Sequence, residues 1–349
     1  MTDDILGKIF YHLCEPGPLS LRHLLFVSRR FYSATVNNGR LWTTISLDPL
    51  FARHFHRWRE QGNIFVEQCL LRSGSLPLCL YIKISRRTAY HSGFLHDFLE
   101  TFWEPEWRTI QRCTSMIWVK GRDTEPTLPM IVALLPKSLP SLKYISLSSF
   151  DDPIDGSQFP NCPVLERVEM LSHRRPSPPF WGTNFLHVTT LSFGMSATWD
   201  SDDMTTLLQF PVLHDLTLFI ERDTGVLFAY GLERPICFKH LQILRVRGPL
   251  PLRVATKLMA PALKELHIEA NPLHRTSIYE LKDLFEPHCQ HIYALLPMAV
   301  SSGQPAWATY LSDLVQKCTR IKSLHISKWM ENECKKFISL YKDVLHYVQ

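Results

Sequence analysis

The chain has 349 residues, of which 45% are hydrophobic and 20% are charged, and this composition excludes an intrinsically disordered protein. The net charge of +5 is small for this length, which argues against an obligate nucleic-acid partner. No secretory signal and no apolar run of about 18 residues is visible, so the sequence predicts an intracellular protein without a membrane span. A chain of this length favours two modules or a solenoid over one compact core.

The nine cysteines form no C-x-x-C pair. Cys162, Cys289 and Cys318 each stand where other copies of a repeat, described below, carry phenylalanine or alanine, which indicates small buried side chains in a reducing compartment. His288 and His291 flank Cys289 as metal ligands would, but Cys289 faces the core in the repeat register, so we favour packing over metal binding. We expect no cofactor.

Residues 1–48 predict three short amphipathic helices. The first ends at Glu15-Pro16-Gly17-Pro18, which cannot continue a helix, and the second covers residues 21–27. The third begins after Ser28 as its cap and ends at Asn37-Asn38-Gly39. The apolar positions of the first helix are Ile5, Leu6, Ile9, Phe10 and Leu13. Helices this short bury too small a core to stand alone, so we expect them to pack against another part of the chain.

Residues 49–76 predict a helical connector. Phe51, Phe55 and Trp58 lie on one face of a helix, with basic residues around them. A basic stretch with interleaved aromatic residues can mark a nucleic-acid site, but aromatic residues that share one face favour a packed helix with a solvated basic side. A second amphipathic segment at 64–71 leads into the first predicted strand.

A fixed spacing of apolar residues dominates the chain from residue 77 onward. The spacing is apolar-x-x-apolar-x-x-apolar-x-apolar, and complete copies begin at Leu139, Cys162, Phe185, Phe210, Phe238, Ala260 and Cys318. A further copy begins at Cys289 and has Pro297 at its last position. The third apolar positions lie 22 to 29 residues apart, which is the interval of leucine-rich repeats.

Each repeat ends in an alternating pattern that predicts a short strand with one buried face. One such unit cannot bury its own apolar face, so it must stack on copies of itself. The expected strand centres are Ile145, Val168, Leu191, Leu216, Leu244, Leu266 and Leu324. Earlier strands are expected at 76–84 and around Ile117 and Val119, with a helix near 94–103 between them.

The fold prediction is therefore α/β. It consists of a leucine-rich-repeat solenoid with a curved parallel sheet at 77–349, preceded by the three-helix unit and the connector. The apolar positions from Cys334 to Val348 recur at helical spacing with lysines opposite, which predicts a C-terminal helix that caps the solenoid.

The three-helix unit resembles an F-box in the order and spacing of its apolar residues. The matching segments are Asp4-Ile5-Leu6-x-x-Ile9-Phe10-x-x-Leu13, then Leu21-x-x-Leu24-x-x-Val27-Ser28-Arg29-Arg30-Phe31, then Leu41-Trp42-x-x-Ile45. F-box proteins are substrate receptors of Skp–cullin–F-box ubiquitin ligases, and many carry leucine-rich repeats behind the F-box. One departure is that Met1-Thr2 stands where the family usually has Leu-Pro.

The resemblance implies that the N-terminal helices bind an Skp-type adaptor subunit and through it a cullin, while partner subunits carry out the ubiquitin chemistry. The residues that it assigns to the F-box core or to the adaptor face are Ile5, Leu6, Ile9, Phe10, Leu13, Leu24, Val27 and Trp42. Most of them would be buried in any three-helix unit, which leaves an alternative open. In that alternative the chain is a leucine-rich-repeat scaffold with no ubiquitin role, and residues 1–48 only cap the solenoid.

The first helix offers a way to separate these alternatives. Ile5, Ile9 and Leu13 line one stripe of it, and Leu6 and Phe10 line the adjacent stripe. A small three-helix unit needs only one stripe for its own core, so the F-box resemblance predicts that part of this surface is exposed. The scaffold alternative predicts that all of it is covered by residues 50–80.

The sequence contains no catalytic constellation: it has no Gly-rich phosphate loop, no G-x-S-x-G motif and no H-E-x-x-H motif. We therefore expect a non-catalytic adaptor whose repeats bind a protein substrate. The residues between the buried strand positions mix both signs of charge, which favours a protein partner over a nucleic-acid groove, although an ordinary solvated sheet face would look the same. The predicted substrate-binding residues are Tyr144, Arg167, Asp215, Arg245, Arg247 and His267, and both Arg245 and Arg247 are expected to be exposed.

Overall fold

The computed structural model describes residues 5–6, 8–10, 26–47, 64, 66–84, 92–120, 132–148, 159–171, 185–195, 207–220, 236–248, 258–270, 291–295, 323–327 and 345–348. The chain divides into two compact units, Met1–Leu165 and Glu166–Gln349, which we call the first and second units. The boundaries predicted from the sequence at residues 48 and 76 both fall inside the first unit. The reason is that the N-terminal helices, the connector and the first strands contact one another, as described below.

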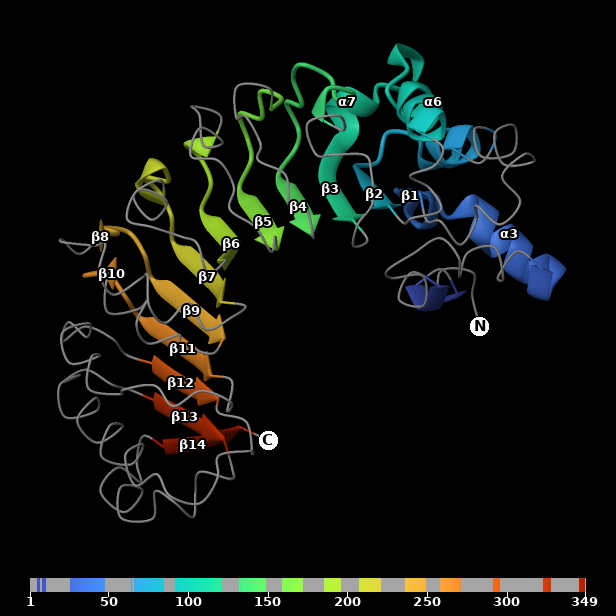
Figure 1. Ribbon diagram of the computed structural model, residues 1–349. Helices are drawn as coiled ribbons and strands as arrows, with labels where there is room; N and C mark the ends of the chain where they lie inside the picture. The colour runs from blue at the N-terminus through green and yellow to red at the C-terminus, as the bar shows by residue number, and fades with distance from the viewer. Residues whose placement is uncertain are drawn as a thin grey trace. The chain divides into compact units, whose positions relative to one another are not determined.

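The first unit contains a run of parallel strands in chain order (Figure 1). They are β1 (Thr44–Leu47), β2 (Leu78–Ile84), β3 (Cys113–Lys120) and β4 (Tyr144–Ser148), and each pairs with the next. Their central residues are aligned across the sheet and fully buried: Ile45, Leu80, Met116 and Ile145. The strand predicted at 76–84 and the strand centre predicted at Ile145 are confirmed.

Strand β3 lies where we expected a strand, but its buried positions differ from the expected ones. Met116 and Trp118 are buried, whereas Ile117 and Val119, which marked the strand in the sequence, are only half-buried. Because side chains alternate between the two faces of a strand, the alignment of Met116 with Leu80 determines which face enters the core.

The helices of the first unit begin and end where the sequence supplies capping residues. α3 (Arg29–Asn37) begins after Ser28, whose Oγ accepts a hydrogen bond from Phe31 N at 3.1 Å, as predicted. The helix at 66–73 ends at Gly74, whose φ of 58° is a left-handed conformation that favours glycine. α6 (Ser92–Phe102) confirms the helix predicted near 94–103. No helix in the described part of the chain has the length and apolar character needed to cross a membrane.

Trp42 joins the N-terminal helices to the connector. Its indole Nε1 donates a hydrogen bond to the carbonyl oxygen of Thr35 in α3 at 2.9 Å, and the guanidinium carbon of Arg72 lies 4.3 Å from the centre of its ring. Gly39, in the 3-10 helix η1 (Gly39–Trp42), approaches the connector so closely that an added Cβ would lie 2.9 Å from the carbonyl oxygen of Arg72. The N-terminal helices therefore pack against the helix at 66–73, as expected for so small a unit.

The second unit also consists of parallel strands, and neighbouring strands in the following order are paired (Figure 1). They are β5 (Arg167–Leu171), β6 (Thr190–Met195), β7 (Asp215–Ile220), β9 (Ile243–Gly248), β11 (Glu265–Ala270), β12 (His291–Leu295), β13 (Ser323–Ser327) and β14 (Leu345–Val348). A separate parallel pair, β8 (Ile236–Cys237) and β10 (Leu258–Met259), precedes β9 and β11 in the chain. The third apolar positions of six repeats form one aligned row, and Ile292 takes the place between Leu266 and Leu324: Val168, Leu191, Leu216, Leu244, Leu266 and Leu324. The spacing of the copy that begins at Cys289 put Leu295 at this place, so the predicted register of that copy is wrong.

The first half of the repeats in the described part of the chain forms a β-turn that was not predicted from the sequence. In six repeats, the N–H of the second apolar residue donates to the carbonyl oxygen of the first at 3.0 to 3.4 Å. The donors are Leu142, Leu165, Val188, Leu213, Leu241 and Leu263. Four of these turns have proline at their second position, where the fixed φ of proline favours the turn: Pro140, Pro163, Pro211 and Pro261. The turn places both apolar residues in the core before the strand begins.

The C-terminal segment corrects the prediction of a capping helix. Leu345–Val348 forms β14 and pairs in parallel with β13, so these residues are not helical; residues 334–344 lie outside the described part of the chain. Pairing gives the backbone groups of β13 partners that a helix at this position could not supply. Leu345 is aligned with Leu324 and therefore continues the row of third apolar positions.

Candidate protein-binding surfaces

The first helix divides its apolar residues between the core and the surface. Leu6 and Phe10 are buried, and the Phe10 ring lies 4.9 Å from the ring of Phe31 in α3. Ile5 and Ile9, on the adjacent stripe, are 48% and 41% exposed. The prediction that part of this helix remains exposed is therefore confirmed, and the buried stripe is the one that contacts α3.

Additional apolar residues are exposed around the start of α3. Phe26 is 78% exposed, and Val27 and Tyr32 are also exposed. Val27 was among the residues predicted to bind an adaptor, whereas Phe26 and Tyr32 were not predicted. The helical periodicity of α3 contained the signal for Tyr32, because the inward positions Ala34 and Thr35 leave it on the outer side. We call Ile5, Ile9, Phe26, Val27 and Tyr32 the apolar surface of the first unit.

Three of the other residues proposed for adaptor binding are buried. Trp42 is fully buried and makes the contacts with Thr35 and Arg72 given above, so it joins parts of the chain and is not available to a partner. Leu6 and Phe10 are buried as well. The proposed residues Leu13 and Leu24 lie outside the described residues.

Four of the six proposed substrate-binding residues come together on β7, β9 and β11 of the second unit. Asp215, Arg245, Arg247 and His267 lie on these adjacent strands, and Arg245 is aligned with His267. Tyr144 lies on β4 in the first unit, where it is half-buried. Arg167, on β5, is exposed and forms an ion pair with Glu169 of the same strand.

Two contacts that involve carboxylates connect the polar side chains of these strands. Arg245 forms an ion pair with Asp215 across β9 and β7, and His267 Nε2 lies 3.2 Å from Glu265 Oε2 on β11. The ion pair leaves only 27% of the Arg245 side chain exposed, so the prediction that Arg245 would be an exposed residue is wrong. This prediction failed because the sequence alone does not show which residue of the adjacent strand lies beside Arg245. Asp215 lies on β7, diagonally across from Arg245 on the same face of the sheet.

Arg247 differs from Arg245 in both exposure and environment. It is exposed, as predicted, and its guanidinium carbon lies 5.4 Å from the centre of the Phe219 ring on β7. Phe219 is half-buried and is aligned with Arg247 across the two strands. We call Asp215, Phe219, Arg245, Arg247, Glu265 and His267 the polar cluster of the second unit.

Burial lowers the pKa of His267 below its ordinary value, and the nearby Arg245 cation acts in the same direction, while the hydrogen bond to Glu265 opposes both. The imidazole is therefore neutral at neutral pH. Because the Glu265 carboxylate can only accept a hydrogen bond, Nε2 carries the proton and donates it. The polar cluster thus offers hydrogen-bonding groups, one exposed cation and an aromatic ring, which suit binding of another molecule.

Three of the cysteines in the described part of the chain behave as packing residues, whereas Cys79 is half-buried and Cys237 is exposed. Cys69, Cys113 and Cys162 are buried, as predicted for Cys162, and burial raises the pKa of each thiol, to about 12 for Cys162. Their thiols therefore stay protonated and unreactive at neutral pH. Cys289 and Cys318 lie outside the described residues.

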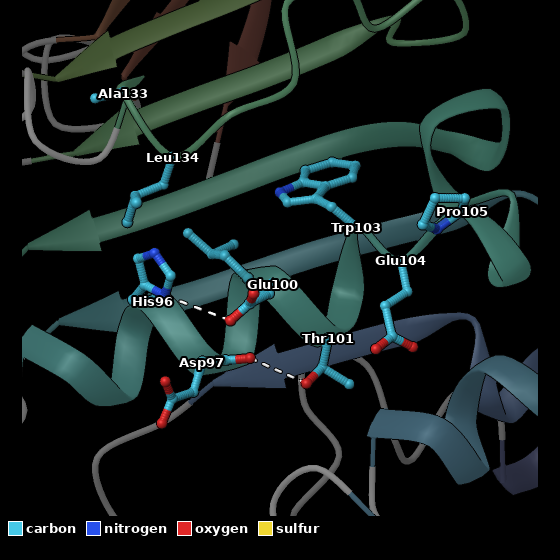
Figure 2. Close-up of a pocket in the computed structure, with 10 residues that line it drawn as sticks. His96, Asp97, Glu100, Thr101, Trp103, Glu104, Pro105, Ala133 and Leu134 are labelled. Carbon is cyan, nitrogen blue, oxygen red and sulfur yellow. Dashed lines mark hydrogen bonds and ion pairs between the residues drawn. The ribbon is translucent and has the colours of Figure 1, made fainter.

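A pocket in the first unit lies beside α6. Its walls are α6, the turn that follows it and the segment at 133–134 (Figure 2). The lining residues are His96, Asp97, Leu99, Glu100, Thr101, Trp103, Glu104, Pro105, Ala133 and Leu134. The carbonyl oxygen of Asp97 accepts a hydrogen bond from Thr101 Oγ1 at 3.0 Å, which belongs to the helix itself. Sequence reasoning did not find this pocket, because its lining residues follow no motif.

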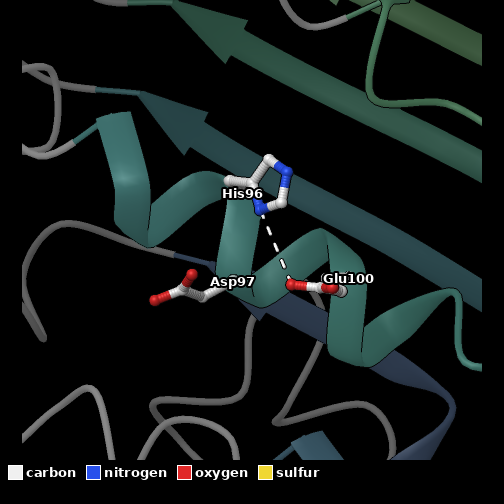
Figure 3. A group of neighbouring side chains, drawn as sticks. All are labelled: His96, Asp97 and Glu100. Atoms are coloured by element: carbon white, nitrogen blue, oxygen red, sulfur yellow. Dashed lines mark ion pairs between the residues drawn. The ribbon is translucent and has the colours of Figure 1, made fainter.

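Three residues of this pocket have metal-ligating side chains. His96, Asp97 and Glu100 place one ligand atom each within 4.8 Å of the others (Figure 3). His96 Nδ1 lies 3.6 Å from Glu100 Oε2, at the i, i+4 spacing of an ordinary surface pair on a helix. His96 and Glu100 are exposed and Asp97 is half-buried, so we interpret the group as a solvated ion pair.

Comparison with known proteins adds no identification. No protein-family model matches the chain, and no curated protein sequence matches it. The assignment of function therefore depends on the two surfaces described above.

Proposed function

We propose that the chain is the substrate-recognition adaptor of a cullin-type ubiquitin ligase. In this proposal the N-terminal helices bind an Skp-type adaptor subunit, the parallel strands belong to a leucine-rich-repeat solenoid, and the solenoid presents a protein substrate. Partner subunits carry out the ubiquitin chemistry. The proposal combines the F-box resemblance of the sequence with the apolar surface of the first unit.

The observation that supports the proposal best is the division of the first helix. Leu6 and Phe10 already fill the core beside α3, so Ile5 and Ile9 are not needed there and remain exposed. Contiguous exposed apolar residues usually mark an interaction site, and burying an exposed isoleucine against a partner stabilises the complex by about 1.5–3 kcal/mol. An adaptor that covers Ile5 and Ile9 would explain why the helix carries two apolar stripes.

The polar cluster supports the substrate-binding half of the proposal. It lies on the face of a parallel sheet, mixes both signs of charge and includes an exposed arginine beside an aromatic ring. Arginine and aromatic residues supply most of the binding energy in many protein interfaces. A protein substrate therefore suits this face better than a nucleic acid.

One observation favours the scaffold alternative. Trp42 contacts both α3 and Arg72, and β1 pairs with β2, so the N-terminal segment also packs on the connector helix and adds the first strand to the sheet of the first unit. In this alternative residues 1–48 serve only to cap the solenoid through these contacts, and no adaptor binds to them.

Co-purification with a purified Skp-type adaptor subunit separates the two functions. The wild-type chain should form a complex, and the double substitution Ile5→Asp and Ile9→Asp should abolish it, because two charges would then have to be desolvated at the contact. Leu71→Asp is the matched control, since Leu71 is also exposed in the first unit but lies on the connector helix.

The control protein should retain the complex, and all three proteins should unfold at similar temperatures. A wild-type chain that binds no adaptor, or a double variant that binds it as well as the wild type, would favour the scaffold.

A further inference from the structure

The pocket beside α6 has the size and the mixed lining of a ligand site. Its volume of about 740 Å³ lies within the range of roughly 300–1,000 Å³ that is typical of small-ligand sites. We propose that it binds a primary ammonium group together with a carbonyl oxygen of the same residue, as found at the free amino terminus or at a lysine of a polypeptide. The lining residues belong neither to the apolar surface nor to the polar cluster, so this inference does not depend on the proposed function.

The charges of the pocket favour a cation. Asp97, Glu100 and Glu104 are acidic, and none of the lining residues described by the structure is a lysine or an arginine. The carboxylates of Asp97 and Glu100 place oxygen atoms within 4.8 Å of each other (Figure 3). Two like charges at this separation repel each other, and a cation that binds beside them lowers the electrostatic energy.

The walls of the pocket favour an organic cation over a bare metal ion. Trp103 N donates a hydrogen bond to the carbonyl oxygen of Leu99 at 2.9 Å, so the helical spacing of α6 continues to Trp103 and places it one turn beyond Glu100. Trp103 and Leu134 are both half-buried, so each leaves part of its surface accessible in the pocket. An aliphatic stem gains from contact with these side chains, and an aromatic ring attracts an ammonium group.

The indole of Trp103 supplies a reason for the carbonyl oxygen. Its Nε1 is buried and has no hydrogen-bond partner in the described part of the chain. A buried donor without an acceptor costs free energy, which a ligand oxygen would recover. Figure 2 shows this nitrogen at the end of the ring that is directed toward Leu134. Because the atom is covered in the unliganded chain, a ligand has to displace part of this wall to reach it.

Titration calorimetry of the purified full-length chain with four defined probes tests this inference. The probes are an alanine-leucine-alanine amide with a free amino terminus, its N-acetylated form, an N-acetylated alanine-lysine-alanine amide, and butylammonium, which has no carbonyl group. The free amino-terminal peptide, the lysine peptide or both should bind with a Kd of about 1 mM or lower. The acetylated peptide without lysine should bind at least roughly tenfold more weakly than the better of these two, because it brings no cation to the carboxylates.

Variants assign the binding to named residues. Glu100→Gln keeps the size of the side chain but removes its charge, and it should weaken every ammonium probe by roughly fivefold, the upper value for an exposed charge pair. Trp103→Phe keeps a ring but removes the donor, so it should weaken the ammonium peptides by roughly three- to tenfold and change butylammonium by less than about twofold. Glu106→Gln is the matched control, because Glu106 in the 3-10 helix η3 (Pro105–Trp107) is exposed and does not line the pocket. The control should bind every probe as the wild type does.

The identity of the binding peptide distinguishes the two sources of the ammonium group. Binding of the free amino-terminal peptide alone assigns the pocket to chain termini, and binding of the lysine peptide alone assigns it to lysine; both results support the inference.

Three results would overturn the inference: no binding of any ammonium probe, equal binding of the acetylated peptide without lysine, or a loss in Glu106→Gln as large as that in Glu100→Gln. A folded Trp103→Phe chain that binds the ammonium peptides as tightly as the wild type would also overturn it. If Trp103→Phe does not fold, the comparison of butylammonium with the ammonium peptides decides whether the carbonyl oxygen contributes, and equal affinities would contradict the inference.

Discussion

The apolar surface of the first unit and the polar cluster of the second unit expose different kinds of side chain. At the N-terminal helices, the apolar side chains of Ile5, Ile9 and Phe26 are exposed and are not part of the core beside α3. On the sheet, Arg245 and His267 are held by carboxylates of the chain itself. The comparison teaches that exposed apolar residues indicate a partner more strongly than charged residues do, because charges on neighbouring strands can satisfy one another.

The largest effect should come from a charge placed in the core of the second unit. Leu216→Asp puts a carboxylate at a position on β7 that is completely buried, and the lost packing and the unpaired charge should lower the free energy of unfolding by at least about 4 kcal/mol. Leu186→Asp, at an exposed turn position of the same unit, should cost less than about 0.5 kcal/mol. Urea denaturation of both variants checks this, and equal stabilities would refute the assignment of the two faces.

Within the first helix, the two stripes should respond differently to truncation. Phe10→Ala removes a buried ring that packs on Phe31 and should lower the free energy of unfolding by about 3 kcal/mol. Ile9→Ala should change it by less than about 0.5 kcal/mol, because Ile9 lies at the surface. Thermal unfolding of the two variants distinguishes core from surface, and a loss of stability in Ile9→Ala comparable to that in Phe10→Ala would mean that the stripe is covered.

The two neighbouring arginines of β9 should also differ in their effects. Arg245→Ala leaves the partly buried Asp215 carboxylate without its cation and should cost about 1–2 kcal/mol of stability. Arg247→Ala should leave stability within about 0.5 kcal/mol and affect only binding. Urea denaturation curves of both variants test this division. If Arg247→Ala destabilised the chain as much as Arg245→Ala, the separation between structural and binding residues in the polar cluster would be lost.

The smallest expected effect is a dependence of stability on pH through His267. Its pKa is lowered in the folded chain, so the unfolded chain takes up a proton near the ordinary value of 6.5 while the folded chain does not. The contribution of His267 is complete above that pH and is lost as the pH falls from 6.5 toward the lowered pKa. His267→Gln should remove this part of the dependence in denaturation curves at pH 7.5 and at pH 5.5. An identical loss in the variant would assign the effect to other groups.

The strand positions could be predicted because two local patterns coincide in every repeat. Alternation of apolar residues indicates the strand, and the preceding apolar-x-x-apolar spacing, often with proline, encodes the turn. Ile145, Val168 and Leu216 could therefore be placed from the sequence with their burial. Ser28 and its bond to Phe31 N were predictable for the same reason, because a capping residue acts over three positions.

The contacts that the sequence could not supply lie between segments that are far apart in the chain. Asp215 and Arg245 are 30 positions apart, and only the alignment of β7 with β9 brings their side chains together. The sequence left open whether Trp42 belongs to the core or to an adaptor face, and its contacts with Arg72 and Thr35 decide for the core. The apolar pattern of a segment as short as Leu345–Val348 fits either a helix or a strand. Its pairing with β13 makes it a strand.

Titration calorimetry of the purified chain with a purified Skp-type adaptor tests the central claim most directly. The account predicts a one-to-one complex whose binding enthalpy becomes more negative as temperature rises, because burial of Ile5, Ile9 and Phe26 gives a negative heat-capacity change. The double variant Ile5→Asp and Ile9→Asp should give no heat of binding. A folded wild-type chain that gives no binding heat at several temperatures would contradict the account and leave the N-terminal helices as a cap.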